Sequence, residues 1–176
     1  MVRQFLPSKQ ANSPSAGLVK AMLLNGAEPM HGQYAPPEVG SPPDNSQGYG
    51  RVDLAATIGP YAPGTTVVFK DEGRSLDTGD GDDTQRDVAA GQTLKATLVW
   101  TDPPGESLQN DLDLIVKTPD GQEFHGNVAP GSPAFDRSNN VEQVIVSVTA
   151  AETATITVRG FRYVSPQPYA LVVRAS

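Results

Sequence analysis

The segment Asn110-Asp111-Leu112-Asp113-Leu114 places two carboxylates between alternating leucines, a pattern suited to holding a cation. On a β-strand, Asp111 and Asp113 point to the same face, with their Cα atoms about 7 Å apart. Two carboxylates on one face repel each other unless a cation or a base lies between them. Calcium suits this position because it is a hard cation that accepts six to eight oxygen ligands in irregular geometry.

Further oxygen donors follow in the segment 136–142, which precedes the next apolar run. A calcium site built from both segments is therefore one interpretation of the pattern. The alternative is a solvated polar strand face on which Lys117 or Arg137 compensates the two aspartates.

A second metal candidate is the acidic stretch from Asp71 to Asp87, in which seven carboxylates accompany two arginines and give a net charge of −5. The spacing does not match an EF-hand, since the sixth and twelfth positions counted from Asp80 are Gln85 and Gly91 rather than Gly and Glu. An acidic, Gly-rich loop is more often simply solvated, and we expect an exposed loop here.

The sequence offers no catalytic constellation of its own. His31 and His125 both have polar, loop-like surroundings, and no Gly-x-Ser-x-Gly turn is present. The paired aspartates could in principle serve glycoside chemistry, but a single Trp and a few Tyr provide little platform for a sugar. We therefore predict no catalytic residue in this chain.

The composition excludes several kinds of site and binding partner. The absence of cysteine excludes a disulfide framework and a thiolate metal site. A net charge of −7 without a basic face argues against nucleic acid as a partner. No apolar stretch approaches the roughly 20 residues that span a bilayer, so no membrane partner is expected.

From about residue 65 onward, apolar and polar residues alternate with a period of two, which predicts short strands with one buried face. Pro119-Asp120-Gly121 is a hairpin turn signal between two of these runs, and the 17 Gly and 16 Pro favour a turn-rich chain. Together these features predict a mainly β fold, an antiparallel β-sandwich or jelly roll. The alternating runs cover residues 93–100, 111–117, 144–148, 153–159 and 169–173.

The first 60 residues have a different pattern. Ser13 and Pro14 are suited to begin a helix that Gly26 ends, and a second short helix is expected after the Gly48–Gly50 turn. The apolar stripe of the first helix is wide, so this helix needs a partner surface. We predict two parts, residues 1–60 and residues 61–176.

The residues of both parts resemble one family, the subtilisin-like serine proteases (subtilases). The run Ser13–Ala27, a Pro/Gly-rich loop and Gly48–Leu54 resemble the end of the catalytic domain of that family. The second half resembles the C-terminal β-sandwich of bacterial alkaline subtilases. The matching pieces, in order, are LVWTDPP from Leu98, NDLDL from Asn110, PDG from Pro119, NNVE from Asn139 and TATITV from Thr153.

The resemblance implies calcium as a cofactor, because such sandwiches bind calcium. It also implies a non-catalytic role in a secreted, extracellular serine endopeptidase, with the upstream catalytic domain as partner and a protein substrate as a second partner. The family's Gly-Thr-Ser-Met-Ala turn is expected just before Met1, so this chain is expected to be inactive alone. The alternative is an independent polysaccharide- or protein-binding module that exposes Phe161, Tyr163 or Tyr169. The metal ligands implied are Asp111, Asp113, Asp136, Asn139, Asn140 and Glu142.

Overall fold

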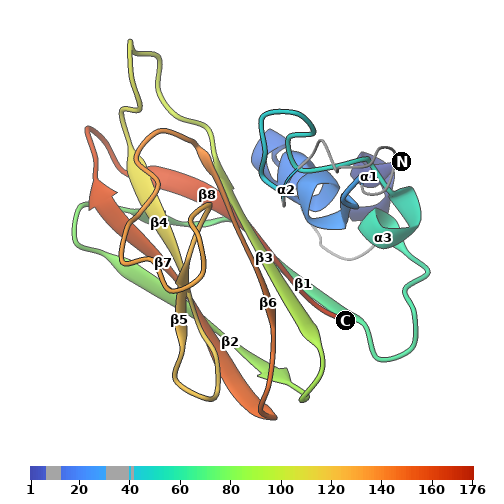
Figure 1. Ribbon diagram of the computed structural model, residues 1–176. Helices are drawn as coiled ribbons and strands as arrows, with labels where there is room; N and C mark the ends of the chain where they lie inside the picture. The colour runs from blue at the N-terminus through green and yellow to red at the C-terminus, as the bar shows by residue number, and fades with distance from the viewer. Residues whose placement is uncertain (7–12, 31–39, 41) are drawn as a thin grey trace.

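The computed structural model describes residues 1–6, 13–30, 40 and 42–176, and it shows two packed β-sheets with a small helical layer against one of them (Figure 1). No helix in the described ranges is both long and apolar enough to cross a bilayer. The elements are α1 Val2–Phe5, α2 Ala16–Gly26, α3 Leu54–Ile58, β1 Thr66–Leu76, β2 Gly81–Val88, β3 Thr93–Trp100, β4 Asp111–Lys117, β5 Glu123–His125, β6 Val141–Ser147, β7 Glu152–Arg162 and β8 Gln167–Ala175.

The strand order is that of a jelly roll. One sheet has the order β1-β8-β3-β6 and the other β2-β7-β4-β5, and all paired strands are antiparallel. Alternate residues of β3 and β4, such as Leu98 and Leu114, are fully buried between the sheets. The period-two pattern therefore gave the correct faces, and the predicted mainly β sandwich is confirmed.

The acidic stretch 71–87 is not the exposed loop that we expected. It forms the end of β1, a short connection and most of β2, and the chain crosses there from one sheet to the other. Exposed and half-buried positions alternate along β2, as on an edge strand. The carboxylates are spread over both sides: Asp82 pairs with Lys70 at 2.9 Å, whereas Asp83 accepts a hydrogen bond from Thr157 at 2.6 Å.

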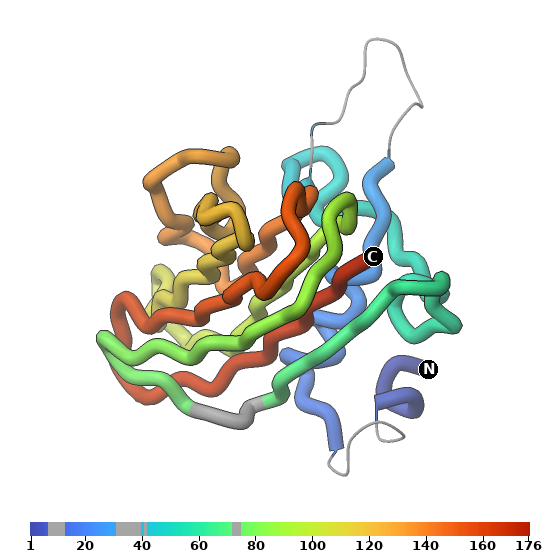
Figure 2. The backbone as a smooth tube through the Cα atoms, turned by 90° about the horizontal axis from the view of Figure 1, so that it is seen from below, coloured from blue at the N-terminus to red at the C-terminus, as the bar shows by residue number. Residues whose placement is uncertain are grey.

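Helix α2 packs on the outer face of the β1-β8-β3-β6 sheet (Figures 1 and 2). Leu18, Ala21 and Met22 are buried there against Val99 and Val172. The partner surface that the wide apolar stripe requires is therefore this sheet. The division into residues 1–60 and 61–176 stays a prediction.

The N-terminus of α2 is fixed by a contact with the acidic stretch. Its N-cap is Ser15, two residues later than expected, and the Ser15 hydroxyl accepts a hydrogen bond from the Leu18 N–H at 2.9 Å. The Ser15 N–H and hydroxyl both donate to Asp71. A carboxylate beside a helix N-terminus is favourable because the helix dipole is positive there.

Several polar groups buried beneath α2 have hydrogen-bond partners. The Asn25 amide donates to Thr97 Oγ1 at 3.1 Å and to the Lys95 carbonyl at 2.9 Å. Lys95 Nζ donates to the Ala27 carbonyl at 2.7 Å, at the end of the helix. Burial lowers the pKa of Lys95 to about 8.

Candidate functional site

Asp111 and Asp113 lie side by side on the outer face of β4, yet both are buried, at 1% and 0% exposure. The Arg137 guanidinium donates to Asp111 Oδ1 at 3.1 Å and also to Asp113 Oδ1. Arg159 of β7 binds the other Asp113 oxygen through Nε at 3.0 Å and Nη2 at 2.6 Å. Burial raises the pKa of Asp111, and the charge of Arg137 opposes that shift.

The two arginines are held in place by aromatic rings. Arg137 stacks over Phe161 with 3.7 Å between the guanidinium carbon and the ring centroid, and Arg159 lies 4.6 Å from the Phe135 centroid. On the far side, His125 stacks on Phe135 with 3.9 Å between centroids. The loop before β6, residues 126–140, contributes Phe135 and Arg137 to this stack, while Arg159 and Phe161 belong to β7. We call residues 126–140 the covering loop.

Glu142 of β6 approaches the same cluster from the opposite sheet. Its Oε2 accepts a hydrogen bond from the Leu114 N–H at 2.6 Å, whereas its buried Oε1 has no partner among the described residues. Burial raises the pKa of Glu142 well above its ordinary value; the Leu114 bond opposes this shift, and the nearby Asp113 reinforces it.

Gly126 makes room for that carboxyl group. A Cβ at position 126 would lie 2.4 Å from Glu142 Oε2 and 2.6 Å from Glu142 Cβ. Asn127, which follows with a φ of 57°, bonds along β6: its N–H donates to the Gln143 carbonyl and its side-chain oxygen accepts from the Gln143 N–H, both at 3.0 Å. The chain therefore passes from the edge of one sheet to the edge of the other at these two residues.

The remaining predicted ligands, Asp136, Asn139 and Asn140, form hydrogen bonds that hold the covering loop in place. Asp136 Oδ2 accepts hydrogen bonds from the amides of Asn127 and Asn139, each at 2.7 Å. The Asn140 amide donates to the Trp100 carbonyl at 3.0 Å, which ties the loop to β3. The structure thus joins Asp111 to Asp113 through Arg137 and joins Asp136 to Asn139, while Asn140 is engaged elsewhere.

The cation between the two aspartates is a guanidinium group in this structure. This matches the alternative in which Arg137 compensates the pair, except that the face is buried instead of solvated. Across residues 1–6, 13–30, 40 and 42–176, no three His, Cys, Asp or Glu side chains are grouped so as to hold a metal ion. With both Asp113 oxygens engaged by arginines, the side chains as they stand do not fit calcium, and calcium binding stays a prediction.

Arg159 is a member of the Asp111–Asp113 cluster that the sequence pattern did not indicate. It lies directly opposite Asp113 in the β4–β7 pairing, a relationship that only the strand register supplies. His31 lies outside the described residues. His125 Nε2 contacts Glu123 of β5 at 2.9 Å and its Nδ1 contacts the Ala134 carbonyl of the covering loop at 2.8 Å, so both ring nitrogens are engaged.

The aromatic residues named for a binding module differ in exposure. Phe161 is 48% exposed, Tyr163 is half-buried and Tyr169 is 3% exposed. Phe161 is the exposed ring of the three, and Arg137 stacks over it, whereas Tyr169 belongs to the buried core between the sheets. These three residues therefore do not form one exposed aromatic face.

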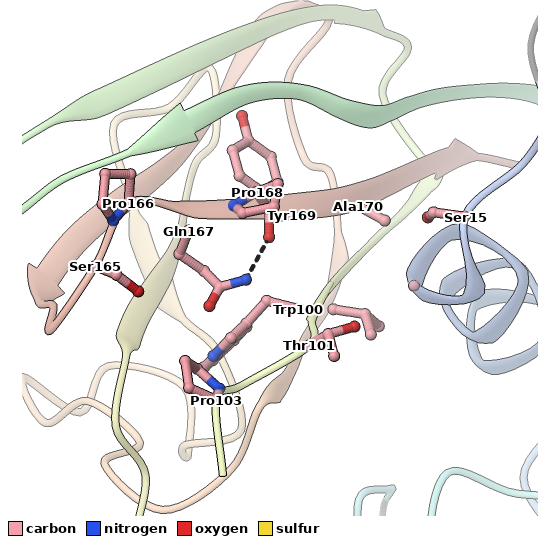
Figure 3. A pocket seen from close by; sticks show the side chains of 12 residues that line it. Ser15, Trp100, Thr101, Pro103, Ser165, Pro166, Gln167, Pro168, Tyr169 and Ala170 are labelled. Atoms are coloured by element: carbon pink, nitrogen blue, oxygen red, sulfur yellow. Dashed lines mark hydrogen bonds between the residues drawn. The ribbon is translucent and has the colours of Figure 1, made fainter.

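A separate cavity of about 200 Å³ lies beside the N-terminus of α2, between Trp100, Pro103 and Gln167 (Figure 3). Gln167 is buried, and its amide donates to the Pro168 carbonyl at 2.7 Å while its oxygen accepts from Asn110 at 2.7 Å. Both ends of this side chain are thus satisfied within the protein.

The fold and the site define a jelly-roll sandwich that carries a buried ion-pair cluster beneath a covering loop. No known family profile matches the chain. In an alignment of 182 positions that covers 93% of this chain, it is 29% identical to the serine protease/ABC transporter B family protein tagA of Dictyostelium discoideum. In an alignment of 93 positions that covers 45% of this chain, it is 33% identical to tagB of the same organism.

The chain spans about a tenth of the first of these relatives and a twentieth of the second. Among solved structures, a family GH115 4-O-methyl-alpha-glucuronidase is similar with a TM-score of 0.34 and 8% identity, over 58% of this chain and 14% of that one. The chain is a β-sandwich distantly related to the serine protease/ABC transporter B family proteins tagA and tagB.

Proposed function

We propose that this chain is the non-catalytic C-terminal β-sandwich region of a secreted, subtilisin-like serine endopeptidase, in which it stabilises the catalytic domain. The observation that carries the proposal is the similarity to tagA, which extends over 93% of the chain and so includes the helical segment as well as the sandwich. The packing of α2 on the β1-β8-β3-β6 sheet supports it, because a buried apolar contact joins the helical segment to the sandwich.

The experiment is to translate the reading frame upstream of Met1 and express the longer product with and without residues 61–176. We expect a Gly-Thr-Ser-Met-Ala turn upstream, casein hydrolysis by the longer product, and a severalfold shorter half-time of thermal inactivation after the deletion. An upstream frame without that turn, or a product that is equally durable without the sandwich, contradicts the proposal.

Calcium enters this proposal as a competitor of Arg137 for the carboxylate pair. The Arg137 side chain is 34% exposed and comes from a loop, whereas Asp111 and Asp113 are fixed on β4. A hard divalent cation would supply the same compensation of charge to these two aspartates. The proposal is therefore that the space between Asp111 and Asp113 requires a cation, which the chain itself provides as the Arg137 guanidinium and which calcium replaces when Arg137 is removed.

A further inference from the structure

A crevice lies at the open edge between β1 and β2, and it takes no part in the features described above. These two strands are edge strands of different sheets, and the crevice between them has a volume of about 200 Å³. It shares Val68, Phe69 and Arg86 with a groove of about 690 Å³ that runs beneath the helical layer toward Met22 and Tyr61. Together they wrap around β1 from the interior of the sandwich to its outer face.

Arg86 stands at the junction of the two spaces without a charge partner. Its Nε is buried and has no hydrogen-bond partner, and its guanidinium forms no ion pair with any carboxylate in the described part of the chain. Thr84, two residues earlier on β2 and lining the same crevice, has a buried hydroxyl that is also unpartnered. The chain has 20 acidic and 13 basic residues, so a guanidinium left without a carboxylate calls for an explanation.

Apolar side chains form much of the walls around these two polar groups, and Lys70, which is paired with Asp82, and Gln85 complete the lining of the crevice. Leu171 and Val173 of β8 line the crevice, and Val67 and Phe69 line the groove. Buried polar atoms without partners are costly, and a guanidinium matches a carboxylate through parallel N–H···O bonds. Ligand sites commonly combine an apolar cavity of about 300–1,000 Å³ with a few convergent polar groups.

We propose that the β1–β2 crevice binds a small apolar carboxylic acid, with the carboxylate at Arg86 and Thr84 and the apolar chain along Val68 and Phe69 in the groove. Charge complementarity selects an acid over a neutral or cationic amphiphile, because the Arg86 guanidinium lines the crevice without a carboxylate partner among the described residues. The proposal concerns a different face from the Asp111–Asp113 cluster and does not depend on the protease assignment.

The test is a calorimetric titration of the full chain with sodium octanoate, 1-octanol and octylamine in parallel, with amide chemical shifts of Val68, Thr84 and Val173 as the locator. We expect octanoate to bind at least about tenfold more tightly than octanol, from the usual strength of a charge-assisted hydrogen bond. Octylamine should not bind. Shifts confined to β1, β2 and β8 should accompany binding.

Two variants assign the carboxylate contact. Arg86→Met keeps the apolar length and should weaken octanoate binding at least about tenfold while leaving octanol binding unchanged. Arg51→Met, at an exposed position outside the crevice, should leave octanoate binding unchanged. If Arg86→Met does not fold, Thr84→Val removes the second donor and should weaken octanoate binding about threefold to tenfold.

An inward-pointing charge on an edge strand also discourages pairing with another chain, and that role alone needs no ligand. Absence of octanoate binding, equal binding of octanoate and octanol, or unchanged octanoate binding in Arg86→Met or Thr84→Val would each overturn the proposal. If the unaltered chain does not bind octanoate and the Arg86→Met variant self-associates in light scattering, the role of Arg86 is to protect the strand edge.

Discussion

The carboxyl group of Glu142 in β6 accepts a hydrogen bond from the backbone N–H of Leu114 in β4, so a side chain of one sheet completes the edge of the other. β5 ends at His125, and the last backbone contact on this side of β4 is the Gly126 N–H to the Leu114 carbonyl at 3.0 Å. Glu142 thus takes the place that the next residue of β5 would have had. It joins the two layers directly.

Gly126→Ala should disrupt this connection. The new Cβ would lie 2.6 Å from Glu142 Cβ, so the Glu142 side chain must move and the bond to Leu114 must break. We expect the free energy of unfolding to fall by about 2–4 kcal/mol, from overpacking and a lost buried hydrogen bond. Urea denaturation followed by circular dichroism measures this change.

Gly81→Ala is the matched control, because Gly81 lies on a strand with open space around the position of its Cβ. Its effect should stay within about 0.5 kcal/mol. Equal destabilisation by the two substitutions would show that Gly126 has no special relation to Glu142.

Arg137→Met should destabilise the protein and create a response to calcium. The substitution leaves the buried Asp111 without its cation, while Asp113 retains Arg159. We expect a loss of about 2–3 kcal/mol, below the usual cost of breaking a fully buried pair because Arg137 is partly exposed. Millimolar calcium should raise the melting temperature of this variant more than that of the unaltered chain, measured against a chelator.

The control adds Asp111→Asn and Asp113→Asn to Arg137→Met, which removes the charges that would attract calcium. The calcium effect should then disappear. A calcium response that survives in this triple variant would place the ion elsewhere, and an Arg137→Met variant as stable as the unaltered chain would contradict the role given to the guanidinium.

Lys95 should make stability rise with pH in the alkaline range. Burial lowers its pKa to about 8 in the folded chain, from 10.5. Between these values the unfolded chain binds the proton that the folded chain has released, so the free energy of unfolding increases as pH rises. The gain is about 3 kcal/mol at most.

Lys95→Met isolates this contribution from tyrosines that titrate at higher pH. As pH rises from 8 to 10.5, the free energy of unfolding of the unaltered chain should increase relative to that of the variant. Parallel pH profiles for the two proteins would rule out Lys95 as the source.

Helix α2 should behave as an integral part of the sandwich. Met22 is 1% exposed against the sheet, and Met22→Ala should cost about 2–4 kcal/mol, whereas Lys20→Ala on the exposed side should be nearly neutral. Hydrogen exchange should show α2 amides as protected as those of β3 and β8. Rapid exchange in α2 with protected strands would mean that the helix docks only loosely.

The sandwich was predictable because its central strands carry a clear pattern. Leu94, Leu98 and Leu114 alternate with polar residues, and their burial follows from that period alone. β2 gave no such signal, since its half-buried positions are Asp82, Thr84 and Arg86. An edge strand with polar groups on both faces is indistinguishable from a solvated acidic loop until its partner β7 is known.

The site was only partly predictable for a similar reason. The repulsion between Asp111 and Asp113 correctly required a positive group between them, and Arg137 was among the groups considered. Arg159 could not be assigned, because strand register places it opposite Asp113 from 46 positions away. Glu142 was selected as a ligand, but its bond to Leu114 depends on how the two sheets stack.

The place of β8 sets the order in which the molecule can be assembled. This last strand of the chain lies between β1 and β3 and pairs with both. A ribosome therefore finishes β1 about a hundred residues before its neighbour exists, and the first sheet remains divided until translation reaches Ala175. Such distant pairing slows folding. Removal of residues Gln167–Ser176 would leave two strand edges, those of β1 and β3, exposed to other chains at once.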